Sequence, residues 1–192
     1  GAAARSRRRF QKAREQFLSL RLDLEAGLYE FKALRDRMFR ELDVMRSQPE
    51  DKNMAALWMA ETLIFDGNRE QAALVLDECR DEILMSRRDM VDYYCFYQYL
   101  HLMLQPNISQ KESLIRLTRK YLSEGTHPGL FFIRLKLDPS LQEAPLTLFS
   151  EMRTLYENGF HSPLLYEAAC RMLKQHPEFL NRPDAFLLQS LD

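Results

Sequence analysis

The feature that most constrains the fold is a stretch of fifteen residues that is apolar almost throughout. Residues 90–104 read MVDYYCFYQYLHLML, in which only Asp92, Gln98 and His101 are not apolar. A helix that is hydrophobic nearly all round belongs inside a packed layer, with other helices against at least two of its sides. The stretch is too short and too polar to span a bilayer. The residues expected to be almost wholly buried in it are Phe96, Leu100 and Leu104.

The N-terminal part of the chain repeats an apolar side chain every seven residues, at Phe10, Phe17, Leu24, Phe31, Met38 and Met45. Two structures satisfy this pattern. One is a single long helix that packs as a coiled coil. The other is an αα-hairpin that reverses at residues 25–28, with Gly27 left-handed and Leu28 making the apolar contact after it. Because glycine costs about 1 kcal/mol inside a helix but little at its C-terminal end, we expect the hairpin.

Turn and capping signals divide the rest of the chain into short helices, and no stretch shows sustained strand alternation. Helices are expected to start near residues 50, 69, 89, 109, 128, 145 and 162, with Asp89 as the cap of the central helix. Every second start therefore recurs after 39, 39 and 34 residues. A helical pair that repeats at about 34–45 residues is typical of a solenoid of stacked hairpins. We expect an all-α fold of antiparallel helix pairs, stacked as a short right-handed solenoid.

The predicted domain layout is one helical-repeat domain that follows a basic segment. With 192 residues, a single domain can bury roughly 70% of the surface of its unfolded chain. The expected parts are a basic segment or helix start at 1–14 and one domain at 15–192. The domain comprises an N-terminal helical hairpin at about 10–46, repeats at about 50–175 and short C-terminal helices at 177–191.

Two segments carry a resemblance to a known repeat family. AETLIFDGNREQAALVLDE resembles a tetratricopeptide repeat, with Gly67 at the turn between the helices and Ala72 at the small packing position. LYENGFHSPLLYEAA is similar, with Gly159 at its turn. The resemblance covers about a third of the chain and implies stacked helical hairpins. HPGLFFIRLKLD and SPLLYEAAC resemble parts of large uncharacterised bacterial proteins, which implies a fragment of such a protein and no particular activity.

The basic residues are unevenly distributed along a chain whose net charge is only −1. That net charge gives no overall attraction to nucleic acid or to acidic membranes. The first fourteen residues nevertheless contain no acidic residue and six basic ones, which are Arg5, Arg7, Arg8, Arg9, Lys12 and Arg14. They are interpreted either as a solvated, partly frayed helix end or as a contact for phosphates or an anionic membrane surface. Because Phe10 is the one aromatic residue among them, base recognition is poorly supported.

The three cysteines, Cys79, Cys95 and Cys170, are odd in number and far apart. Neither a disulfide framework nor a zinc-ribbon spacing can be drawn from them. We expect small core residues in a reducing compartment, and therefore a cytoplasmic protein. The basic start is not followed by the apolar run of a signal peptide, and this chain contains no predicted transmembrane segment.

No spacing of residues in the chain carries a recognisable reaction. Glycine-rich phosphate loops, zinc-binding histidine pairs and nucleophile elbows are absent from the sequence. The histidines His101, His127, His161 and His176 stand alone. We therefore expect no enzyme, no catalytic residue, no metal and no cofactor. Trp58 is expected to be a core anchor rather than a ligand platform.

One polar stripe crosses the otherwise apolar stretch. Tyr94, Gln98 and His101 are spaced i, i+4 and i+7, which places them on one face of a helix. They either line a groove or form hydrogen bonds inside the core.

We expect a non-catalytic scaffold that binds a peptide or a neighbouring domain, including the rest of its own parent chain, on a concave face. The alternative is association with nucleic acid, the less favoured partner, or with an anionic membrane surface through the arginine-rich segment.

Overall fold

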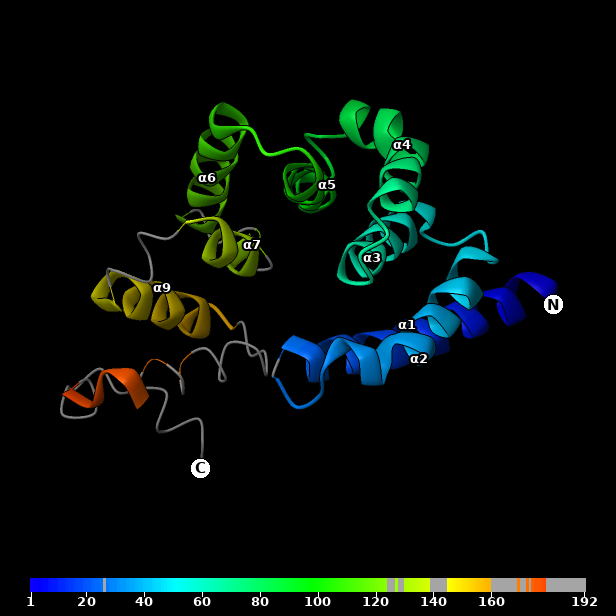
Figure 1. The fold of residues 1–192 in the computed structure, drawn as a ribbon, viewed down its shortest axis with the longest axis horizontal. Coiled ribbons are helices and arrows are strands. Elements are labelled where there is room, and N and C mark those ends of the chain that lie inside the picture. The colour runs from blue at the N-terminus through cyan, green and yellow to red at the C-terminus, as the bar shows by residue number, and fades with distance from the viewer. Residues whose placement is uncertain are drawn as a thin grey trace. The chain divides into compact units, whose positions relative to one another are not determined.

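The computed structural model describes residues 1–25, 27–123, 127, 130–138, 145–159, 169, 172 and 174–178. Within these ranges all regular structure is helical and no strand occurs, which confirms the all-α prediction (Figure 1). The helices with described bounds are α1 (Ala2–Glu25), α2 (Phe31–Arg46), α3 (Lys52–Phe65), α4 (Arg69–Met85), α5 (Val91–Leu104), α6 (Ile108–Ser123), α7 (Leu130–Leu137) and α9 (Pro145–Glu157).

The contacts of the backbone divide the chain into two compact units, Gly1–Leu114 and Ile115–Asp192, and the boundary falls inside α6. Each unit is described by itself below. The single domain expected from residue 15 onward stays a prediction. The helix start expected near residue 162 and almost all of the C-terminal helices expected at 177–191 lie outside the described residues.

The N-terminal hairpin is present, because α1 ends at Glu25 and α2 begins at Phe31 and packs beside α1 (Figure 1). Gly27 has a φ of 72°, which glycine adopts without the penalty of a side chain. Its N–H donates to the Leu24 carbonyl at 3.1 Å, and the Leu28 N–H donates to the Asp23 carbonyl at 3.0 Å. This pair of bonds is the Schellman motif. The apolar contact predicted for Leu28 is wrong, since 67% of that residue is exposed.

The same turn joins α3 to α4. Gly67 has a φ of 80°, its N–H donates to the Ile64 carbonyl at 3.0 Å, and the Asn68 N–H donates to the Leu63 carbonyl at 2.9 Å. Glycine is therefore required at Gly67 for the same reason as at Gly27.

Helix α3, not α5, is the central helix of the Gly1–Leu114 unit. It packs against α2, α4 and α5, and every residue from 55 to 63 is buried. The side chain of Trp58 is part of this core, with its ring 5.3 Å from the ring of Phe17 in α1, so the prediction of a core anchor is confirmed. The apolar residues of the N-terminal heptad pattern are turned toward the same core, since Phe17, Met38 and Met45 have no exposed surface.

The burial expected along α5 is only partly correct. Leu100 has no exposed surface, but Phe96 and Leu104 are half-buried. The predicted cap is also wrong: Met90 precedes the first turn and makes no side-chain capping bond, so Asp89 does not cap this helix. The physical reason is that α3 and α4 pack against α5 but leave other parts of its circumference partly open to solvent.

Asp51 connects the start of α3 to α5. It is the one described residue other than glycine with a positive φ, at 36°. Its Oδ1 accepts a hydrogen bond from the Met54 N–H at 3.2 Å, and its Oδ2 accepts one from the hydroxyl of Tyr93. The left-handed backbone costs a residue with a side chain about 1–2 kcal/mol, which these two bonds offset.

Two substitutions at Asp51 separate the side-chain bonds from the backbone strain. Asp51→Ala loses both bonds and keeps the strain, so we expect the free energy of unfolding to fall by about 1–2 kcal/mol. Asp51→Gly also loses both bonds but relieves the strain, so we expect a loss smaller by about 1 kcal/mol. Denaturant melts of the two variants beside the wild type measure both losses. An Asp51→Gly variant that is no more stable than Asp51→Ala would show that the backbone here is not strained.

Candidate functional site

The polar stripe predicted on α5 consists of Tyr94, Gln98 and His101, and all three are half-buried. None of them makes a side-chain hydrogen bond with any residue that the structure describes. The ring of His101 instead stacks on Tyr97, with ring centroids 6.1 Å apart and planes inclined by 28°. The interpretation of the stripe as a hydrogen-bonded part of the core is therefore not supported by any bond among the described residues. Whether the stripe lines a groove stays a prediction, since neither of the two cavities described below is lined by it.

All six basic residues predicted as electrostatic contacts lie in α1 and are exposed. None forms an ion pair within the described part of the chain, as expected. Four of them recur at i, i+3, i+4 and i+7, which places them on one side of the helix. These four, Arg5, Arg8, Arg9 and Lys12, are called the basic face below.

The segment that carries the basic face is packed, so the interpretation of a partly frayed helix end is wrong. Phe10 and Ala13 of the same segment are only 7% and 2% exposed and belong to the core of the Gly1–Leu114 unit. The hydroxyl of Ser6 lies 2.9 Å from the side-chain oxygens of both Gln48 and Glu50. Residues 1–14 are therefore an integral part of helix α1, which holds the basic residues in a fixed row.

A cavity of about 310 Å³ lies between α2, α3 and α4. Its lining includes Arg46, Lys52, Asn53, Glu78, Cys79 and Glu82. Asn53 is only 8% exposed, and its side-chain amide makes no hydrogen bond with any described residue. This site is called the Asn53 cavity below.

The charges around the Asn53 cavity differ in how far they are already paired. Arg46 and Glu78 form an ion pair, with Nη2 2.5 Å from Oε2. Lys52 and Glu82 are exposed, and neither forms an ion pair within the part of the chain that the structure describes. Within the described part of the chain, the cavity therefore offers a cation, an anion and an amide that have no partner.

Sequence reasoning missed the Asn53 cavity, although the sequence contains a signal for it. An asparagine near a helix start is usually a cap. Here Asp51 caps α3, which leaves the amide of Asn53 uncommitted one position inside the helix. An asparagine directly followed by the apolar run from residue 54 to 60 could have been noticed as a buried polar group.

The described cysteines are not activated. Burial raises the pKa of the Cys79 thiol to about 11 and that of the Cys95 thiol to about 12. Both are therefore protonated at neutral pH, whereas the thiolate is the form that attacks electrophiles and binds metals. Cys79 lies at the wall of the Asn53 cavity as an uncharged group. Cys170 lies outside the described residues.

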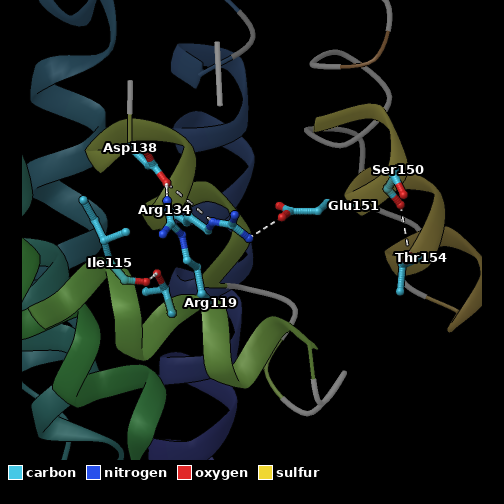
Figure 2. A network of polar contacts seen from close by, with 8 residues as sticks. Ile115, Arg119, Arg134, Asp138, Ser150, Glu151 and Thr154 are labelled. Atoms are coloured by element: carbon cyan, nitrogen blue, oxygen red, sulfur yellow. Dashed lines mark hydrogen bonds and ion pairs between the residues drawn. The ribbon is translucent and has the colours of Figure 1, made fainter. Parts of the chain in front are cut away.

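A network of ion pairs lies in the unit Ile115–Asp192 (Figure 2). Arg134 of α7 is buried, with 8% of its side chain exposed, and its Nη1 is paired with Oε1 of Glu151 in α9. Arg119 of α6 lies with Nη2 2.5 Å from Oδ2 of Asp138, which is 4.0 Å from Nε of Arg134. The charges of the two cations and the two carboxylates thus balance, and their ion pairs connect α6, α7 and α9.

A second cavity, of about 150 Å³, adjoins this network and is lined by Leu122, Phe131, Arg134, Ser150, Glu151 and Leu155 among others. Nε of Arg134 and Oε2 of Glu151 have no hydrogen-bond partner, but each exposes less than 1 Å². A molecule in the cavity would therefore not reach either atom. The network is best explained as a buried connection between helices. Sequence reasoning missed it because Arg119, Arg134 and Glu151 resemble ordinary solvated charges of separate helices.

Among the residues that the structure describes, no group of three or more His, Cys, Asp or Glu side chains could hold a metal ion. A search of the same residues finds no helix that is long and apolar enough to cross a membrane. Of the isolated histidines, His161 lies outside the described residues.

A comparison with protein families connects the chain to a described family. Residues 2–192 match a family of unknown function, DUF5717, in its N-terminal part. No curated protein and no solved structure matches the chain.

Proposed function

We propose that this chain, which belongs to the DUF5717 N-terminal family, is a non-catalytic module that binds a protein or peptide partner. The partner is a peptide or a neighbouring domain, including the rest of a longer parent chain. We further propose that its helix pairs stack as a short, right-handed, tetratricopeptide-like solenoid. The successive hairpins α1–α2 and α3–α4, with the same glycine turn, support this arrangement, as does the packing of α3 against both α2 and α5.

The observation that carries the proposal is the polar stripe on α5. Tyr94, Gln98 and His101 are half-buried, aligned and without side-chain hydrogen bonds to any described residue. Aromatic residues such as Tyr94 are enriched in the cores of protein interfaces, where most charged residues are depleted. A partner segment laid along the stripe would cover the exposed parts of the rings and satisfy their polar atoms.

Replacing His101 with alanine is expected to change the free energy of unfolding by no more than about 1 kcal/mol, because the ring is partly exposed and leaves no hydrogen-bond partner behind. Leu100→Ala, in the same helix, is the matched control and is expected to cost about 2–5 kcal/mol because Leu100 has no exposed surface. Denaturant melts measure both. Comparable losses in the two variants would remove the stripe as a binding surface and make it structural.

A photo-crosslinking residue tests the binding itself. We would replace Gln98 with benzoylphenylalanine in cells that naturally make the chain, and Gln71, an exposed residue of α4, as the control position. The expected result is a set of crosslinked adducts from position 98 that do not form from position 71. The substitution Tyr94→Ala should remove these adducts. The same adducts at both positions, or adducts at position 98 that Tyr94→Ala leaves unchanged, would contradict the proposal.

A second candidate function is association with a phosphate-rich partner through the basic face. The observation that favours it is that six basic residues of α1 are exposed and lack ion pairs within the described chain. A salt titration distinguishes the two functions. Four phosphate contacts would make the logarithm of the binding constant for duplex DNA fall by roughly 3.6 per tenfold rise in salt. Vesicles with and without phosphatidylserine test binding to an anionic membrane. Each basic residue near the membrane surface contributes about 1 kcal/mol to the free energy of that binding.

A further inference from the structure

Buried polar side chains in folded proteins nearly always have a hydrogen-bond partner. Asn53 is more than nine-tenths buried as a residue, and its amide has no partner among the described residues, although the amide atoms are still reached by solvent. It also lines a cavity of about 310 Å³. Ligand sites in proteins occupy about 300–1,000 Å³ and combine apolar walls with a few placed polar groups. The cavity is therefore large enough for a small ligand or a short segment of chain.

The polar groups of the Asn53 cavity define what would fit. A side-chain amide presents a donor and an acceptor next to each other. One peptide unit of an extended chain presents the complementary acceptor and donor, which is how extended peptides are commonly held. The ammonium of Lys52, on α3, and the carboxylate of Glu82, on α4, also line the cavity, and neither forms an ion pair with a described residue.

We propose that the Asn53 cavity binds an extended peptide segment, with Asn53 bonded to one peptide unit and with Lys52 and Glu82 paired to an acidic and a basic side chain of that segment. This inference rests on the proposed peptide-binding function and assigns it a second site, distinct from the stripe on α5. The Arg46–Glu78 ion pair stays closed and forms a wall of the site. Cys79 contributes only an uncharged surface, because its thiol remains protonated at neutral pH.

The experiment selects peptides from a random heptapeptide library on phage, with the whole chain as target, and measures the binding of fluorescein-labelled versions of the enriched peptides by anisotropy. Asn53→Ala is expected to weaken binding by roughly tenfold or more, the loss of about one to two hydrogen bonds. Glu70→Lys is the matched control, since Glu70 is an exposed carboxylate of α4 outside the cavity, and it should change binding less than about twofold.

The charges give a second and independent readout. The double variant Lys52→Glu, Glu82→Lys should enrich peptides in which acidic and basic residues stand in the opposite order to those that the wild-type chain enriches. In a ¹⁵N-labelled wild-type chain, the side-chain amide resonance of Asn53 should shift when an enriched peptide is added. This measurement needs no substitution and so does not depend on whether a variant folds.

Enriched peptides that are insensitive to Asn53→Ala and leave the Asn53 resonance unmoved would overturn the inference. If those peptides are instead lost with Tyr94→Ala, the proposed function stands and only the second site fails. Failure to enrich any peptide would also overturn the inference, whereas the crosslinking at position 98 would still decide the proposed function by itself.

Discussion

Replacing Arg21 with methionine is expected to lower the free energy of unfolding by about 3–5 kcal/mol, among the largest losses that one substitution can cause in this chain. The reason is its partner, Glu61, of which only 1% is exposed. Nε of Arg21 lies 2.7 Å from Oε1 of Glu61, and Nη2 lies 3.2 Å from Oε2. Without the guanidinium, a carboxylate would be left in the core of the Gly1–Leu114 unit with no opposite charge.

The ionic character of this pair is supported by the pKa of Arg21. Burial alone would lower the pKa of the guanidinium, but the attraction of Glu61 and the hydrogen bond between them outweigh it, so the net shift is upward. The guanidinium thus stays charged around neutral pH, and the pair connects α1 to α3 across the core. A buried pair of this kind contributes little net stability by itself, because the two charges had to leave water.

The matched control is the double variant Arg21→Met, Glu61→Leu. Removing both charges abolishes the penalty of an uncompensated carboxylate, so we expect the double variant to recover most of the stability that Arg21→Met loses. Urea or guanidinium melts of the wild type, the two single variants and the double variant give the coupling energy. If the double variant loses as much as the sum of the single variants, the two side chains do not act as a pair.

This ion pair shows why part of the fold could not be predicted from the sequence. Arg21 and Glu61 are forty residues apart, and each has the spacing of an ordinary charged position on an amphipathic helix. Local patterns report which face of a helix is apolar, but they do not report which distant helix a charge meets. The same limit hid the pairing of Arg134 with Glu151.

Local signals succeeded where the backbone itself imposes a requirement. Gly27 and Gly67 were read as turns between helices because a left-handed residue at a helix end needs no side chain, and both have the expected positive φ. The starts of α3, α4 and α9 also lie within about two residues of the signals that predicted them.

The central helix was misidentified because apolar composition was taken as a measure of burial. The α5 stretch is richer in aromatic residues, but Tyr93, Tyr94, Phe96 and Tyr99 are only half-buried. In α3 the small residues Ala55, Ala56 and Ala60 are buried, and they allow neighbouring helices to approach closely. Glu61 and Thr62 of α3 are buried as well, which their polar character does not predict.

The second large effect concerns the start of α1. The layout expected from the sequence sets residues 1–14 apart from a domain at 15–192, whereas in the structure Phe10 and Ala13 belong to the core. Phe10→Ala removes a ring that is 7% exposed and should lower the free energy of unfolding by about 3–5 kcal/mol. Deletion of residues 1–14 also removes Ala13 and the contacts of Ser6, and should cost more. Since a domain is stable by only about 5–15 kcal/mol, the deletion is expected to unfold much of the Gly1–Leu114 unit.

Charge and packing in this segment can be tested separately, because the six basic side chains are exposed whereas Phe10 and Ala13 are buried. The control changes all six basic residues of residues 5–14 to glutamine, which keeps the helix propensity and leaves Phe10 and Ala13 in place. Because those six side chains are exposed and lack ion pairs in the described chain, each change should alter the stability by no more than about 0.5 kcal/mol. Thermal melts compare the variants, and vesicles containing phosphatidylserine report binding. A glutamine variant as unstable as Phe10→Ala would mean that the charges are structural, and the second candidate function would then lose its basis.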